Sequence, residues 1–258
     1  MTGHIANESL VDEIKPQKTV WGPWATAGFG FIVLAVFFLV QFAVGLVYVA
    51  MKILTTPGID IQKFTEEAKC DGTLLSIASL FSSIVSLVFI ALFAKIRKTR
   101  STLDYLGIRA VRLKTLTGCA CIAIGIVAVS DAVTYFLGRP IVHEFMSTMY
   151  STVMFKPLLW LAICFAAPVF EEVFFRGFLF TGFQKSRLGN AGAILLTTLP
   201  WTMMHVQYGV YELSQIFVLG VVLGYTRVRS ESTVPAIIMH ITINLVATTE
   251  TAIVTAGG

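Results

Sequence analysis

Apolar residues run along most of this chain in long stretches, which short polar segments separate. A run of about 20 apolar residues is long enough to cross a bilayer as a helix, because the hydrocarbon core is about 30 Å thick and each helical residue adds about 1.5 Å. The pattern therefore predicts an all-α fold, a polytopic transmembrane helix bundle of about seven to eight helices. The eighth is a connection at 139–156, which we expect to be partly interfacial. The predicted spans are residues 24–51, 73–95, 116–137, 157–180, 191–208, 212–228 and 233–249.

The polar segments between the spans differ in charge. The loop between the second and third spans carries seven basic residues, opposed only by Asp104. Because basic loops stay on the cytoplasmic side, this loop predicts a multi-pass integral membrane protein with a cytoplasmic amino-terminal tail, residues 1–20, and an outer loop at 55–72. The basic residues of the loop are Lys95, Arg97, Lys98, Arg100, Arg109, Arg112 and Lys114.

Composition supports the membrane assignment and excludes a soluble domain. The 258 residues are 56% hydrophobic and 13% charged, with a mean hydropathy of +0.80. A soluble domain carries about 25% charged residues. The net charge of +4 follows from the loop asymmetry, so the sequence predicts membrane lipid and no nucleic acid among its partners.

Three ionisable residues interrupt the fourth apolar run, namely Glu171, Glu172 and Arg176. Each charge at the centre of a membrane helix costs about 2.5–3.5 kcal/mol, so a functional role is the default hypothesis. Glu172 and Arg176 are four residues apart and can pair on one helix face. Glu171 is rotated about 100° away and has no partner in its own span, which suits a general base. Pro168 predicts a bend just before this group.

Two later spans also carry polar residues. His205 lies late in the fifth apolar segment, while His240 and Asn244 are four residues apart on the seventh. His240 and Asn244 therefore share a helix face and can both donate hydrogen bonds, as an oxyanion site requires. Polar contacts between helices are the alternative for these residues, and Asp131 of the third span is interpreted as a partner for a buried donor. Convergence on one partly wet, buried polar cavity would satisfy the carboxylate, both histidines and the asparagine together.

These residues form an ordered pattern that resembles the CAAX prenyl protease and bacteriocin-processing (CPBP, or ABI) family of intramembrane endopeptidases. The family pattern is Glu-Glu-x-x-x-Arg, then Phe-x-x-x-His, then His-x-x-x-Asn. The resemblance covers about residues 157–250, and its one departure is a Trp at the usual Phe position. The matching segments are Glu171-Glu172-Val173-Phe174-Phe175-Arg176, Trp201-Thr202-Met203-Met204-His205 and His240-Ile241-Thr242-Ile243-Asn244.

The resemblance implies a metal-independent hydrolase that cuts a peptide bond of a membrane-associated or prenylated protein. By this resemblance Glu171 with His205 would activate a water, and His240 with Asn244 would bind the oxyanion. Glu172 and Arg176 would hold these groups in place. The chain then divides into the 1–20 tail, amino-terminal spans and loops at 21–156, a catalytic core at 157–250 and a carboxyl-terminal tail at 251–258.

Two alternatives remain open at this point. Glu171, His205 and His240 are also a minimal zinc set, so a zinc cofactor would give a metal-dependent form of the same hydrolysis. A non-catalytic membrane binding or immunity protein is the second alternative.

The depth of His205 in the membrane is a separate question, since a straight fifth helix would place His205 nearer the outer side than Glu171. A bend of the fifth helix at Pro200, a deeper start of this helix or a strong tilt would each bring His205 to the depth of Glu171.

Overall fold

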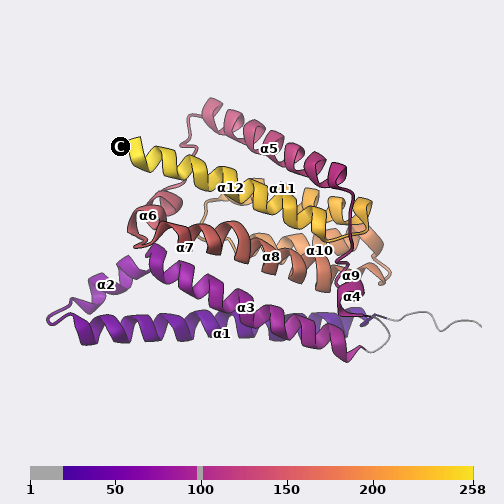
Figure 1. The fold of residues 1–258 in the computed structure, drawn as a ribbon, viewed down its shortest axis with the longest axis horizontal. Helices are drawn as coiled ribbons and strands as arrows, with labels where there is room; N and C mark the ends of the chain where they lie inside the picture. The colour runs from indigo at the N-terminus through magenta and orange to yellow at the C-terminus, as the bar shows by residue number, and fades with distance from the viewer. Residues whose placement is uncertain (1–19, 98–100, 258) are drawn as a thin grey trace, which may run out of the picture.

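The computed structural model describes residues 20–97 and 101–257, and these form helices joined by short connections (Figure 1). The predicted cytoplasmic tail lies outside the described residues except for Val20, as do Lys98 and Arg100 of the basic loop. The all-α prediction is confirmed.

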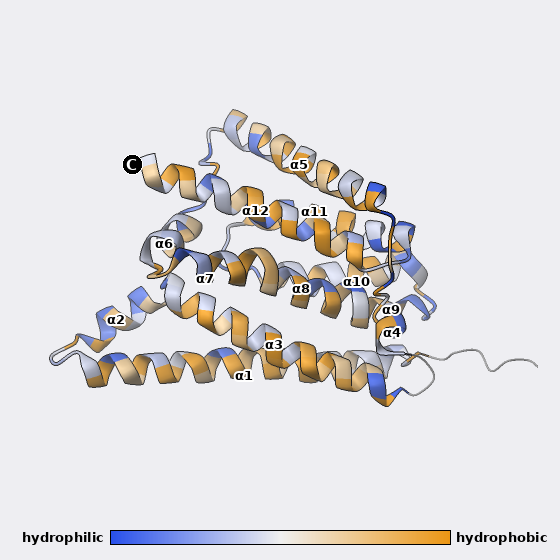
Figure 2. Cartoon of the chain, in the orientation of Figure 1, coloured by the Kyte–Doolittle hydropathy of each residue, from blue (hydrophilic) through white to orange (hydrophobic). Residues whose placement is uncertain are grey.

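Five helices in the described ranges are long and apolar enough to cross a membrane. They match the first, second, third, fourth and seventh predicted spans. Figure 2 shows hydrophobic residues along most of the length of these helices. Many of their large apolar side chains are exposed, for example Phe31 (72%) and Phe42 (65%) on α1, which is the pattern of a lipid-facing surface. The five are α1 (Pro23–Thr55), α3 (Gly72–Ile96), α5 (Leu113–Phe136), the composite helix Lys156–Gln184 and α12 (Val234–Gly257).

The fifth and sixth predicted spans are also helices, but they differ from the prediction. Helix α10 (Gly189–Met203) has only 15 residues, about 22 Å of helix at 1.5 Å per residue, so it is too short to cross a bilayer alone. Helix α11 (Val210–Ser230) packs against it through two buried glycines. A Cβ on Gly220 would meet Thr198 and Trp201, and one on Gly224 would meet Ile194, so both glycines permit a close contact between the two helices.

The composite helix is not a regular α-helix. It consists of α7 (Lys156–Trp160), a π-helical turn η1 (Leu161–Ala166), α8 (Ala167–Glu172), a second π-helical turn η2 (Val173–Leu179) and α9 (Phe180–Gln184). In η1 the amide of Ala167 donates to the carbonyl of Ala162, five residues back. Pro168 follows directly and has no amide hydrogen to donate. The irregularity predicted at Pro168 is therefore a widened turn, and α8 starts there with Glu171 and Glu172 in its last turn.

The bundle has two chemically different ends. One end, at the right of Figure 1, contains α4 (Thr102–Tyr105), α9 and the turn between α11 and α12; we call it the basic end. The other, at the left, contains α2 (Ile61–Ala68), α6 (Glu144–Thr152) and the end of α12; we call it the α6 end. The described Lys and Arg side chains of the basic end are Lys95, Arg97, Arg109, Arg112, Lys114, Lys185, Arg187, Arg227 and Arg229.

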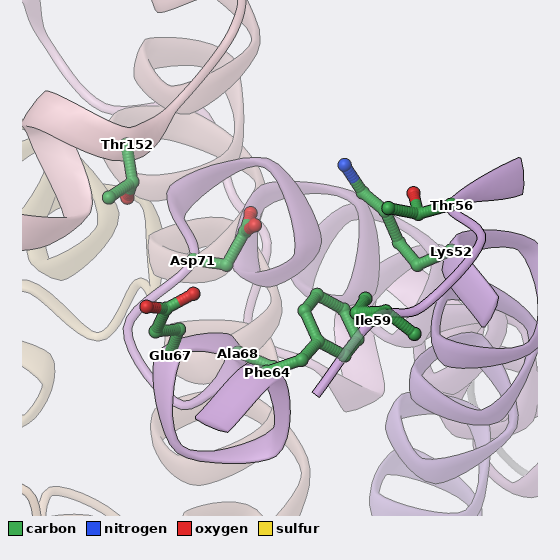
Figure 3. Close-up of a pocket in the computed structure, with 8 residues that line it drawn as sticks. All are labelled: Lys52, Thr56, Ile59, Phe64, Glu67, Ala68, Asp71 and Thr152. Carbon is green, nitrogen blue, oxygen red and sulfur yellow. The ribbon is translucent and has the colours of Figure 1, made fainter. Parts of the chain in front are cut away.

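A surface pocket of about 560 Å³ lies at the α6 end between α1 and α2 (Figure 3). Lys52 and Glu67 line it together with Asp71. Asp71 has a structural role there, because its carboxylate caps α3 by accepting from the amides of Thr73 and Leu74 and also accepts from the Tyr48 hydroxyl at 2.8 Å. None of the predicted site residues lines this pocket.

Candidate active site

The carboxylate of Glu171 is held by a residue from another helix. The indole Nε1 of Trp201, on α10, donates a hydrogen bond of 2.5 Å to Oε2 of Glu171. Trp201 is 1% exposed, whereas Glu171 is only half-buried and lines a cavity. Glu171 therefore combines one fixed oxygen with access to the cavity.

Glu172 points into a different, fully buried environment. Its Oε1 accepts from Arg176 Nη1 at 3.0 Å, which confirms the predicted ion pair, and it also contacts His240 Nδ1 at 2.9 Å. Both Glu172 and Arg176 are 0% exposed. Arg176 Nη2 donates to the carbonyl of Gly220 at 3.1 Å, and its guanidinium lies over the ring of Trp201 at 4.5 Å. These contacts link α8, η2, α11 and α12 around one buried ion pair.

Both histidines pack against the ring of Trp201. The ring centroid of His205 is 5.2 Å from that of Trp201, and the ring centroid of His240 is 5.5 Å from it. His205 Nδ1 lies 2.9 Å from the carbonyl oxygen of Trp201, which can only accept, so this nitrogen carries a proton. His240 Nδ1 faces a carboxylate in the same way. In the neutral state both rings therefore keep the Nε2 lone pair as an acceptor.

Asn244 makes a hydrogen bond to the backbone that was not predicted from the sequence. Its Nδ2 donates to the carbonyl of Ile163 at 2.9 Å. This carbonyl lies in η1, where the Ala167 amide is bound to Ala162 and Pro168 has no amide hydrogen. Asn244 thus satisfies a carbonyl that the π-helical turn leaves free, while the second hydrogen of its amide group is available to another acceptor.

A cavity of about 460 Å³ joins the predicted site residues. Tyr208, from the connection between α10 and α11, lines it, and burial, with a smaller contribution from Glu212, raises the pKa of this phenol to about 12. The Tyr208 hydroxyl therefore stays protonated near neutral pH. Asp131 also lines the cavity and lies near the carboxyl group of Glu250 on α12. The predicted residues along the cavity are Glu171, His205, His240 and Asn244.

The depth of His205 has a simple structural explanation. The helix that carries Glu171 continues beyond the predicted span end to Gln184. By residue count, Glu171 and Trp201 are then about equally far from the short connection between α9 and α10. Helix α10 ends at Met203, and His205 lies in the turn that follows. None of the three explanations considered from the sequence is needed to bring Trp201 beside Glu171.

Sequence reasoning missed the role of Trp201 as a donor, although the signal was present. A Trp at the Phe position of the motif adds an N–H group, and a buried indole N–H usually finds an acceptor.

The alternative zinc set is not gathered in this structure: no three His, Cys, Asp or Glu side chains in residues 20–97 and 101–257 form a group that could hold a metal ion.

The fold and the cavity define a polytopic helical membrane protein with ionisable residues converging inside the bundle. Residues 152–246 match the family model of Type II CAAX prenyl endopeptidase Rce1-like proteins. The predicted family resemblance is therefore confirmed over these residues. The matched region contains every predicted site residue. Comparison with curated proteins and with solved structures gives no match.

Proposed function

We propose that this protein hydrolyses a peptide bond of a membrane-associated or prenylated protein, with Glu171 as general base and without a metal ion. The observation that carries the proposal is the position of Glu171. One carboxylate oxygen is fixed by Trp201, and the side chain lines a cavity that His205, His240 and Asn244 also line. A general base needs this combination of fixed orientation and access to water.

The hydrogen bonds around His205 support a role in positioning the attacking water. With Nδ1 bound to the Trp201 carbonyl, neutral His205 offers Nε2 as an acceptor. A water that donates one hydrogen to Glu171 and the other to His205 has its lone pairs directed away from both. Glu171 then removes a proton as this water attacks the scissile carbonyl.

The contacts of His240 and Asn244 support stabilisation of the oxyanion. When both ring nitrogens of His240 carry a proton, Nδ1 donates to Glu172 and Nε2 can donate to the oxyanion. Asn244 contributes its second amide hydrogen. Glu172 and Arg176 act through His240 and Trp201, because neither is exposed to the cavity.

The decisive experiment incubates the purified protein with a prenylated CAAX peptide and with an unprenylated control peptide. The wild-type protein is expected to cleave, and Glu171→Gln, which nearly preserves shape but removes the base, is expected to lose cleavage while inserting normally into membranes. Unchanged biological function of a well-folded Glu171→Gln protein would instead favour a non-catalytic binding or immunity role.

A further inference from the structure

Tyr208 is placed beside His205 by the turn that follows α10. The amide of His205 donates to the carbonyl of Thr202 at 3.0 Å, and the amide of Tyr208 donates to the carbonyl of His205 at 3.0 Å. Side chains three residues apart in such a turn lie one above the other. The rings of His205 and Tyr208 are accordingly stacked, with centroids 6.4 Å apart and planes at 20°. His205 therefore packs against a second aromatic ring besides that of Trp201.

This second ring restricts a motion that the hydrogen bond of His205 leaves open. Nδ1 of His205 is held at the carbonyl oxygen of Trp201, and the side chain is half-buried beside the cavity. A ring held only at Nδ1 can still tilt about that bond, and the tilt would swing Nε2, the proposed acceptor for the attacking water. A ring stacked on the imidazole face limits this tilt.

The contact of Tyr208 with the site is made by its ring and not by its hydroxyl. Burial raises the pKa of the Tyr208 phenol to about 12, so the hydroxyl stays protonated and cannot take a proton from water. The side chains that influence this hydroxyl are Gln207 and Glu212, neither of which is a predicted site residue. The ring, in contrast, packs on His205.

The ring of Tyr208 is in turn held by the start of α6. His143 meets it edge-on with the centroids 5.0 Å apart, and Phe145 does so at 5.9 Å. His143 also caps α6, because its Nδ1 accepts from the amide of Phe145 at 3.1 Å. The two rings are therefore fixed relative to each other. Both lie outside the family-matched region, residues 152–246, so this support comes from a part of the chain that the match does not cover.

The other end of α6 is attached to the start of α3. The amide of Gly72 donates to Thr152 Oγ1 at 2.9 Å, and the amide of Met154 donates to Thr73 Oγ1 at 2.9 Å. A Cβ on Gly72 would overlap the carbonyl oxygen of Met149, so the two helices are in close contact here. Helix α6 is thus a fixed support for Tyr208 rather than a loosely attached segment.

We propose that Tyr208 is a positioning residue for the hydrolysis, whose ring holds His205 with Nε2 directed at the attacking water while α6 holds Tyr208. The inference rests on the proposed endopeptidase function. Tyr208 acts through His205 and makes no bond to the reacting atoms. The support of the water-positioning histidine then extends from α10 to α6.

The orientation of His205 is tested without a substrate, by labelling the histidines of the full chain with ¹⁵N and recording their ring nitrogens in detergent. The chain has four histidines, so His205→Gln identifies the signals of His205. At a pH where this ring is neutral, wild-type protein is expected to show one tautomer, with the proton on Nδ1. Tyr208→Leu is expected to give a mixture of tautomers, and the conservative variant Tyr208→Phe to restore the single form. Tyr225→Leu, which removes an exposed tyrosine of α11, is the matched control and should give the wild-type spectrum.

Phe145→Leu tests the same support from α6 and also serves if Tyr208→Leu does not fold. It should change the His205 signals in the same direction, because it removes one ring that holds Tyr208. Phe155→Leu, at an exposed position just after α6, is its control. Unchanged His205 signals in folded Tyr208→Leu protein, or in Phe145→Leu protein, would overturn the inference.

Kinetics with the prenylated CAAX peptide test the consequence for the reaction. Tyr208→Leu is expected to lower kcat about tenfold and to change KM less than about twofold, since a displaced positioning group slows the chemical step. Tyr208→Phe should recover most of kcat. In the His205→Gln background, Tyr208→Leu should not lower the residual rate further. Loss of kcat in Tyr208→Phe would assign the role to the hydroxyl, and an effect on KM alone would assign it to substrate binding; either result would contradict positioning.

The outcomes separate this inference from the proposed function. If the wild-type protein cleaves no peptide, the endopeptidase proposal fails, and the histidine spectra still decide whether Tyr208 holds His205. If the CAAX peptide is cleaved and Tyr208→Leu changes neither the His205 signals nor kcat, the endopeptidase proposal stands and the role assigned to Tyr208 is wrong.

Discussion

Trp201 and Glu171 are joined by a hydrogen bond of 2.5 Å from the indole Nε1 to Oε2 of the carboxylate. The same tryptophan presents its carbonyl to His205 and its ring face to Arg176. One residue thus connects the proposed base, the proposed water-positioning histidine and the buried ion pair. The Phe of the family pattern could provide the packing but not the N–H group.

Trp201→Phe removes this donor and retains an aromatic ring. A hydrogen bond to a charged group contributes about 1.5–3 kcal/mol, so loss of the fixed Glu171 orientation is expected to lower kcat about tenfold or more. KM should change little, because the substrate does not contact the buried indole. Steady-state kinetics of the purified variant check this.

The control for Trp201→Phe is the same substitution made in Glu171→Gln protein. If Trp201 acts through the carboxylate, the residual rate of Glu171→Gln should not fall further when Phe is introduced. A wild-type kcat in the single variant, or an additive loss in the double variant, would show that Trp201 does not position the base.

Gly220→Ala offers an independent way to disturb Trp201. A Cβ at this position would lie 2.6 Å from Thr198 Cγ2 and 3.0 Å from Trp201 Cε3, so Thr198 must shift and the indole must move by a few tenths of an ångström against Glu171. Gly224→Ala, one turn away on α11, is the matched control, because its nearest atoms are the side-chain atoms of Ile194 at 3.1 Å. Activity should fall markedly in the first variant and modestly in the second, with rates compared at equal folded fractions. Equal losses would contradict the assignment.

The long spans could be predicted from sequence because length and apolarity alone decide whether a helix crosses a membrane. The end of α10 could not, because its run stays apolar past Met203 and no Gly or Pro follows until Gly209. The helix ends where His205 Nδ1 contacts the carbonyl oxygen of Trp201. The hydropathy of the sequence does not indicate such a contact.

The convergence of the site was predictable for a related reason. Polar groups are costly in an apolar run, so Glu171, His205 and His240 were expected to meet. Their hydrogen-bond partners were not predictable, because these depend on the two π-helical turns. A π-helical turn changes which residues face each other without any periodic signature in the sequence.

Glu172→Gln is expected to destabilise the fold as well as reduce activity. It leaves the guanidinium of Arg176 buried without its charge partner, and removal of one member of a buried pair typically costs about 3–5 kcal/mol. Thermal unfolding in detergent should show a clear fall in Tm. Glu67→Gln breaks an exposed pair with Lys63 at 3.8 Å and should leave Tm nearly unchanged. Similar Tm values for both variants would mean that the buried pair is not structural.

Metal removal separates the two forms of the proposed hydrolysis. In the metal-free mechanism Oε2 of Glu171 is held by Trp201, so treatment with EDTA or phenanthroline followed by dialysis is expected to leave the cleavage rate unchanged. Loss of cleavage that Zn²⁺ restores would replace this mechanism with the zinc form, in which Glu171, His205 and His240 are the ligands. Metal content of the purified protein should be measured in the same samples.

Asn244 has two roles to separate, since it satisfies the Ile163 carbonyl and is a proposed oxyanion donor. Asn244→Ala leaves that carbonyl without its partner, which should lower the free energy of unfolding by about 1–3 kcal/mol. Pro168→Ala restores an amide hydrogen in the following turn, so the same Asn244 substitution should cost less stability in that background. Catalysis should respond differently: if Asn244 also binds the oxyanion, Asn244→Ala lowers kcat in both backgrounds by about 10²-fold or more. Recovery of kcat together with stability in the Pro168→Ala background would restrict Asn244 to its structural role.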